Sequence, residues 1–177
     1  ERPSDMGFVC VATKAIAAGG TLAVSGRPMS ACRPPGAAAT VPQDYDNRML
    51  GTFGIVTNTS RGELSVIDLD QDRLVDLDPL IPGFNTVPVG NQPEALSVSP
   101  DGCQVVTANR GSCDLTMVDS SRLLANQMAS KTPSTQPGHV TRTVVPMTAT
   151  GRLQAAPHEI VFLPQPLAHL RDDKALC

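Results

Sequence analysis

Short segments of alternating apolar and polar residues, separated by turns with glycine or asparagine, fill the middle of the chain. Residues 55–58 (Ile-Val-Thr-Asn) precede a polar turn, and 64–68 (Leu-Ser-Val-Ile-Asp) follow it. Residues 105–109 (Val-Val-Thr-Ala-Asn) and 115–119 (Leu-Thr-Met-Val-Asp) repeat this order. β-Branched residues favour strands, whereas glycine, asparagine and serine favour turns, so each copy predicts a β-hairpin.

The second hairpin belongs to a predicted unit of four strands. It follows the first hairpin after 51 residues, counted from Asn58 to Asn109. The four strands are expected at 93–99, 103–109, 113–119 and 141–146, with a Pro-Asp-Gly turn at 100–102. An insertion at 120–139 begins as a short capped helix and continues as a loop rich in proline, serine and threonine. Residues 157–164 repeat the spacing of the two prolines in 93–100 and predict the first strand of a further unit.

Four antiparallel strands that recur at roughly 40–50 residues are typical of a β-propeller blade. The predicted fold class is therefore all-β, with about two to three blades of four antiparallel strands each. The expected organisation is a degenerate blade portion with a Pro-, Ala- and Gly-rich loop at 1–50, a partial blade at 51–86, a full blade at 87–150, and the start of a further blade with a tail at 151–177. Residues 8–11 and 21–24 are candidate strands of an earlier hairpin in the first portion. A stacked β-sandwich is the alternative, but it does not require two copies at a fixed spacing.

Residues 89–102 (Val-Gly-Asn-Gln-Pro-Glu-Ala-Leu-Ser-Val-Ser-Pro-Asp-Gly), together with the second hairpin, resemble the YVTN-type β-propeller repeat. Residues 56–58 and 66–68 match the later part of a second copy. The resemblance is specific over about 53–120 and weak over 151–164. It implies a closed ring of about seven blades, which is more than this sequence supplies.

An open stack of blades would leave two apolar faces in water, and soluble proteins rarely expose such patches. We therefore expect the chain to be part of a larger ring that missing blades or other protein chains complete. A native mass well above 18.6 kDa would show that other subunits are present.

The predicted function is a structural or protein-interaction module that presents loops, at 25–50 and 120–139, to a partner. The resemblance also implies an alternative, a lactonase-like hydrolase or a cofactor-dependent oxidoreductase that uses the central channel. Glu94, His158 and Glu159 stand at the starts of predicted blades and are the titratable residues to inspect for that alternative. The catalytic residues remain unknown, because the sequence contains no Gly-x-Ser-x-Gly elbow, phosphate-binding loop or dinucleotide fingerprint.

Four aspartates, Asp68, Asp70, Asp72 and Asp76, alternate with other residues after the first hairpin. Alternating carboxylates on a tight loop can converge on calcium, which makes these residues the candidate metal ligands and calcium the one candidate cofactor. Arg73 occupies the place where such loops need glycine, so the pattern favours an exposed acidic turn. Asn58-Thr59-Ser60 fits an N-glycosylation acceptor, but its place in the hairpin favours turn chemistry.

Composition narrows the function and the location. The net charge of −3 argues against a nucleic-acid partner, and no apolar run approaches the ~20 residues of a transmembrane segment. Five cysteines without Cys-x-x-Cys spacing favour disulfides and an exported protein, located in the periplasm, on the cell surface or outside the cell. Cys10 and Cys32 are the expected pair. Cys103 and Cys113 are not expected to pair, because the predicted strand separates them by on the order of 20 Å.

Overall fold

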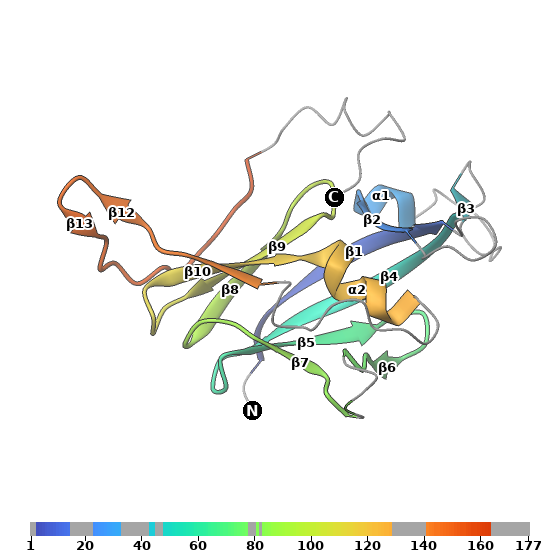
Figure 1. The fold of residues 1–177 in the computed structure, drawn as a ribbon, viewed down its shortest axis with the longest axis horizontal. Helices are drawn as coiled ribbons and strands as arrows, with labels where there is room; N and C mark the ends of the chain where they lie inside the picture. Colours follow the sequence, from blue (N-terminus) through green and yellow to red (C-terminus); the bar gives the residue numbers. More distant parts are fainter. Residues whose placement is uncertain are drawn as a thin grey trace.

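The structure of the chain is a computed structural model that describes residues 3–14, 23–32, 43–44, 48–77, 81, 83–128 and 141–163. Nearly all of the regular structure in these residues is β-strand, which confirms the predicted all-β class (Figure 1). In chain order the elements are β1 (Pro3–Lys14), β2 (Ala23–Arg27), α1 (Met29–Cys32), β3 (Gln43–Asp44), β4 (Arg48–Asn58), β5 (Glu63–Asp68), β6 (Arg73–Leu74), β7 (Thr86–Pro88), β8 (Pro93–Val98), β9 (Gln104–Asn109), β10 (Asp114–Asp119), α2 (Ser120–Met128), β11 (Thr141–Val144), β12 (Met147–Thr148) and β13 (Gly151–Arg152).

The strands form two main antiparallel sheets and one small hairpin. The first sheet has the order β2-β1-β4-β5-β6, with β3 paired to β4 and β7 paired to β5. The second sheet has the order β8-β9-β10-β11, which is the order expected for the four-stranded unit. The hairpin β12–β13 projects from the left end of the molecule in Figure 1, and among the described strands neither main sheet closes on itself.

The two repeated hairpins, β4–β5 and β9–β10, have the same register. Asn58 pairs with Glu63 in the first, and Asn109 pairs with Asp114 in the second. The last residue of each connecting turn has a positive φ, 68° at Gly62 and 54° at Cys113. The sequence placed Cys113 opposite Asn109. That register was wrong by one residue, because Cys113 completes the turn and the strand begins after it.

The two sheets pack face to face around one apolar core. Alternate residues of each strand point into this core, as the period of a β-strand requires. The first sheet contributes Val9, Val11, Phe53, Ile55, Leu64, Val66 and Val87, and the second contributes Leu96, Val105 and Val118. A Cβ atom on Gly7 of β1 would lie 2.3 Å from Leu96 Cδ2 and 2.8 Å from Val98 Cγ2. Glycine at this position therefore allows β8 to approach β1 closely.

The amino-terminal region contains an antiparallel strand pair where the earlier hairpin was expected. Residues 8–11 lie within β1, and β2, which contains residues 23–24, pairs with β1 with Thr13 opposite Val24. The same β1 pairs along its other edge with β4, so it is the neighbour of the first repeated hairpin. Part of the stretch 25–50, expected to be a loop, forms β2, α1, β3 and the start of β4. Local composition missed the start of β4 because β4 pairs with β1, which lies far away in the chain.

The helix and the strand that were expected later in the chain have different outcomes. The helix expected at the start of the insertion is present as α2, and Asp119 caps it, since Asp119 Oδ1 accepts a hydrogen bond from Arg122 N at 3.0 Å. Residues 157–163 were expected to form a strand, and that prediction was wrong, because no described strand pairs with them. Residues 129–140 and 164–177 lie outside the described residues.

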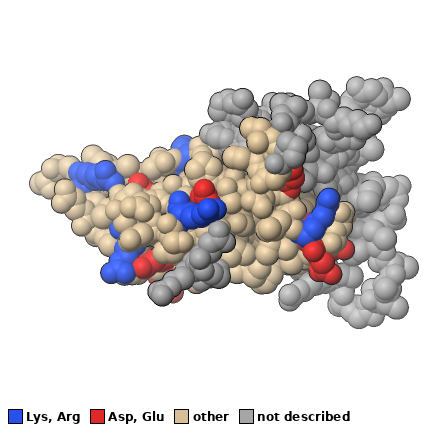
Figure 2. Space-filling model, turned by 90° about the horizontal axis from the view of Figure 1, so that it is seen from below, with Lys and Arg blue, Asp and Glu red and all other residues tan. Residues whose placement is uncertain are grey.

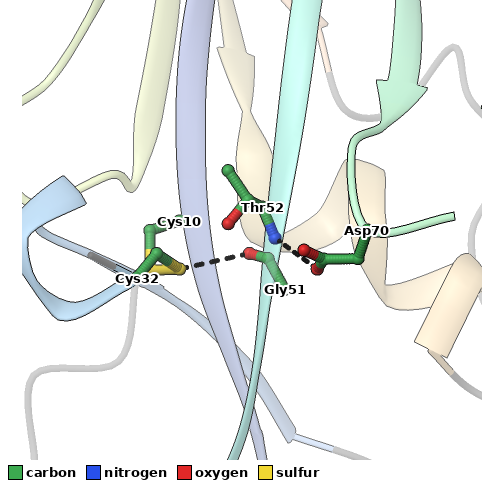
Figure 3. The surroundings of a disulfide bond; sticks show 5 residues. All are labelled: Cys10, Cys32, Gly51, Thr52 and Asp70. Carbon is green, nitrogen blue, oxygen red and sulfur yellow. Dashed lines mark hydrogen bonds between the residues drawn. A yellow bond between two sulfur atoms is a disulfide. The ribbon is translucent and has the colours of Figure 1, made fainter. Parts of the chain in front are cut away.

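A disulfide joins Cys10 of β1 to Cys32 of α1, with a Cα–Cα distance of 5.8 Å, as the sequence predicted (Figure 3). The Cys32 sulfur also lies 3.5 Å from the Gly51 carbonyl oxygen of β4. Since a disulfide sulfur carries no hydrogen, this is a packing contact. Cys113 is a free thiol and Cys103 is disulfide-bonded, so the two do not pair with each other, which confirms the second prediction.

Surface charge on the face seen in Figure 2 is sparse. Basic and acidic side chains lie there in small groups separated by uncharged surface, without a continuous patch of one sign. Within the described ranges, neither helix is long and apolar enough to cross a membrane.

Candidate functional site

A pocket of about 550 Å³ opens at the end of the two sheets where the turns of the repeated hairpins lie. It is built from β1, the β4–β5 turn, the segment that leads into β8, and the extended segment after β13. Its lining is polar and consists of Ser4, Thr59, Ser60, Asn91, Gln92, Glu94 and His158.

Both carboxylate oxygens of Glu94 are hydrogen-bonded in this pocket. Arg110 Nη1 donates a hydrogen bond to Glu94 Oε1 at 2.8 Å, and His158 Nδ1 donates one to Glu94 Oε2 at 2.9 Å. The side chains are 27% exposed for Glu94, 50% for Arg110 and 61% for His158. Both carboxylate oxygens thus have a partner at the surface, where ion pairs contribute little to stability. The cluster connects residue 158 to the start of β8.

The hydrogen bond from Arg110 lowers the pKa of Glu94 below its ordinary value of 4.5, and the His158 hydrogen bond acts in the same direction, while burial opposes both. Arg110→Ala should therefore raise the pKa of Glu94, because it removes the largest cause of the decrease. A ¹³C NMR titration of the Glu94 carboxyl group measures this directly. The depressed pKa stabilises the folded state above pH 4.5, and this contribution is lost as the pH falls through the lowered value.

Arg122→Ala is the matched control for this titration. Arg122 pairs with Asp119 at the start of α2, where its Nε lies 3.4 Å from Asp119 Oδ2. Its removal should leave the Glu94 titration unchanged. An unchanged pKa of Glu94 in Arg110→Ala would contradict the assigned cause.

Hydroxyl groups connect the two sheets at the base of the pocket. The carbonyl oxygen of Pro93, which begins β8, accepts hydrogen bonds from Ser4 Oγ at 3.0 Å and from Thr59 Oγ1 at 2.8 Å. One residue further along β1, Asp5 Oδ2 accepts a hydrogen bond from Leu96 N at 2.7 Å. These contacts run from the first sheet to the second, so they fix how the two sheets meet at the pocket.

The segment before β8 is held by the β9–β10 turn. Asn91 N donates to Ser112 Oγ at 3.0 Å, and Arg110 N donates to the Gln92 carbonyl oxygen at 2.9 Å. Gln92 has a φ of 52°, a conformation that favours glycine and is strained for other residues. The turn therefore holds the backbone of the pocket wall in an unfavourable conformation.

A buried polar network lies under this wall. Asn109, which is fully buried, donates through Nδ2 to Asp114 Oδ1 at 2.7 Å and to Thr116 Oγ1 at 2.9 Å. Its Oδ1 accepts a hydrogen bond from Thr107 Oγ1 at 2.9 Å. The first hairpin has a smaller version, in which Asn58 Nδ2 donates to Ser65 Oγ at 3.1 Å. Asparagine thus has the same role at the end of β4 and at the end of β9.

The candidate calcium ligands do not converge. Asp68 Oδ1 accepts hydrogen bonds from Asp70 N at 3.0 Å and from Gln71 N at 3.1 Å, which is a local turn. Asp70 Oδ2 accepts from Thr52 N at 3.0 Å (Figure 3), and Asp76 Oδ2 accepts from Gly83 N at 3.0 Å. Asp72 is exposed and has a φ of 50°. Across the described parts of the chain, no group of three or more histidine, cysteine, aspartate or glutamate residues could hold a metal ion.

Two of the three titratable residues proposed from the sequence do meet. Glu94 and His158 are hydrogen-bonded at the pocket, whereas Glu159 is exposed and does not line it. Sequence reasoning missed Arg110. Its position in the sequence could have indicated this contact, because Arg110 directly follows Asn109, and Asn109 pairs with Pro93 at the start of β8.

Comparisons with known proteins add little to this geometry. No protein family model and no curated protein matches the chain. Among solved structures, it is similar to the hydrazine synthase of Kuenenia stuttgartiensis, with 25% sequence identity and a TM-score of 0.34. That match covers 40% of this chain and 18% of the hydrazine synthase chain.

Proposed function

We propose that this chain is a structural or protein-interaction module, part of an exported β-propeller of the YVTN type in which the two main sheets are adjacent blades. Its loops and its uncovered sheet face are the surfaces offered to partners. The Cys10–Cys32 disulfide supports an oxidising, exported location, since such bonds are rare in the cytosol.

Equivalent faces of the two sheets point in the same direction, which supports the assignment of the sheets as successive blades. Val105 and Val118 pair across β9 and β10 and belong to the core between the sheets. The positions 51 residues earlier are Gly54 and Ile67, which pair across β4 and β5. These two residues lie on the face of the first sheet that points away from the core. Successive blades of a propeller would have their equivalent faces in this same direction, which supports the proposal.

The observation that carries the proposal is a partly exposed apolar face of the first sheet in the described part of the chain. A continuous cross-strand row runs from Phe8 through Gly54 and Ile67 to Leu74. Phe8 is 42% exposed and Leu74 is 54% exposed. Met6 and Leu69 lie beside this row, because a Cβ atom on Gly54 would meet Met6 Cε at 3.0 Å and Leu69 Cδ2 at 3.7 Å. We call these six residues the open face. Contiguous apolar surface of this kind marks an interaction site.

A propeller enzyme is the second candidate, and the meeting of Glu94 with His158 at a polar pocket is the observation that favours it. A histidine held by a carboxylate can act as a general base. The arrangement supports an enzyme less than it supports an interaction module. Both oxygens of Glu94 are already paired, and Ser4 and Thr59 direct their hydroxyl groups toward Pro93 and each other. No described side chain is therefore held as a nucleophile by His158.

Binding of the dye 1-anilinonaphthalene-8-sulfonate tests whether the open face is accessible apolar surface. We expect the folded wild-type protein to enhance the dye's fluorescence and Phe8→Asp to abolish most of that enhancement, because a carboxylate would interrupt the row. Met147→Asp is the matched control. Met147 is 68% exposed on the β12–β13 hairpin, outside the open face. Wild-type protein that gives no enhancement at a concentration at which it is monomeric would refute the proposal.

A further inference from the structure

We propose that the open face binds the outer face of the second sheet of another copy of this chain, so that copies associate head to tail. This inference rests on the proposed function and names its partner. The outer face is the side of the second sheet opposite the core, and it carries Val106, Ala108, Leu115, Met117 and Val144. Val106 and Ala108 are buried, so Leu115, Met117 and Val144 form its accessible part.

The core between the two sheets shows which surfaces fit each other. There, the face of the second sheet that contains Val105 and Val118 packs against the face of the first sheet that contains Ile55, Leu64 and Val66. The open face has the same position in the first repeat as the face with Val105 and Val118 has in the second. Its expected partner is therefore a surface equivalent to the face with Ile55, Leu64 and Val66.

The chain carries that partner surface at its other end. Residues 51 positions after Ile55, Leu64 and Val66 are Val106, Leu115 and Met117. Their pairing places them in two adjacent rows of one face, since Met117 pairs with Val106, and Leu115 pairs with Ala108 on one side and with Val144 on the other. Leu115, Met117 and Val144 remain partly exposed. One chain thus supplies both halves of the interface, on opposite ends of its two-sheet stack.

The two faces are different, so the contact is heterologous. Each copy bound in this way still presents one unused open face and one unused outer face. Such a contact either closes into a ring or continues as an open chain of copies. All the residues named in both faces are uncharged and apolar, so the association is expected to depend on buried apolar area rather than on charge. Added salt should therefore not dissociate it.

Sedimentation velocity over a range of protein concentrations tests the proposal with two blocked variants. Phe8→Asp blocks the open face, and Met117→Asp blocks the outer face. We expect the wild-type protein to associate as its concentration rises, and each variant alone to remain at the monomer mass of 18.6 kDa. An equimolar mixture of the two variants should form a species of twice that mass and no larger one, because each copy retains one complementary intact face.

Circular dichroism and thermal unfolding check that the variants fold. Leu74→Asp replaces Phe8→Asp if the latter fails, because Leu74 lies at the edge of the open face and is more exposed. Met147→Asp should associate as the wild-type protein does.

The outcomes separate this inference from the proposed function. Wild-type protein that binds the dye but stays monomeric overturns the second copy as the partner and leaves the proposed function standing. Met117→Asp that still associates also overturns it, since the open faces would then pair with each other. A mixture that stays monomeric while the wild type associates overturns the head-to-tail geometry. Wild-type protein that neither binds dye nor associates refutes the proposed function itself.

Discussion

Gly102→Ala is expected to lower the free energy of unfolding by about 4 kcal/mol, the largest single-residue effect anticipated in this fold. Gly102 has a φ of 73°, which an alanine adopts only with strain. An added Cβ would also lie 2.4 Å from the Arg27 carbonyl oxygen and 2.9 Å from Arg27 N. These are backbone atoms of β2, which cannot move without shifting the strand. Urea unfolding followed by circular dichroism measures the loss.

Gly83→Ala separates the two causes of that loss. Gly83 has a similar φ of 84°, but no atom lies within 4 Å of an added Cβ. Gly83→Ala should therefore lower the free energy of unfolding only by the cost of the left-handed backbone conformation, about 1 kcal/mol. Equal losses in the two variants would show that the approach of β2 to the 100–102 turn is looser than the structure describes.

Asn109→Ala is expected to lower the free energy of unfolding by about 3 kcal/mol, because it leaves buried polar groups without their partner. Asn109 is fully buried and makes three side-chain hydrogen bonds, to Thr107, Asp114 and Thr116. Its loss should also loosen the pocket wall, since the network packs under Gly90. A Cβ on Gly90 would lie 2.4 Å from Asn109 Nδ2. Equilibrium unfolding in urea again gives the difference.

The repeat provides the matched control, Asn58→Ala. Asn58 occupies the same position of the first hairpin but is only half-buried and donates one hydrogen bond, to Ser65. Its replacement should lower the stability by about 1 kcal/mol. If the two substitutions had the same effect, burial of the Asn109 network would not be the source of the stability.

Local sequence predicted the hairpins well because strand and turn preferences act over a few residues. The equal spacing of Asn58 and Asn109 from their hairpin partners was therefore evident in the amino-acid sequence itself. The pairing of β1 with β4 was not, because partners such as Val9 and Phe53 lie far apart in the chain, and loop composition carries no information on long-range pairing. The candidate site shows the same division. Glu94 and His158 could be named, but Arg110 meets Glu94 through the pairing of β8 with β9, and Ser4 reaches the pocket through the packing of one sheet on the other.

The sequence by itself determined that this chain builds paired β-hairpins with a repeated register, that Cys10 and Cys32 are suited to pair, and that the four strands from β8 to β11 follow one another in space. These features depend on alternation, turn residues and short connections. Only the tertiary structure decided which strand completes the first sheet, that Gly26 and Gly102 meet backbone to backbone, and that the open face stays partly exposed. Each of these is a contact between segments far apart in the chain, and such contacts depend on side-chain volumes and hydrogen bonds that no local pattern encodes.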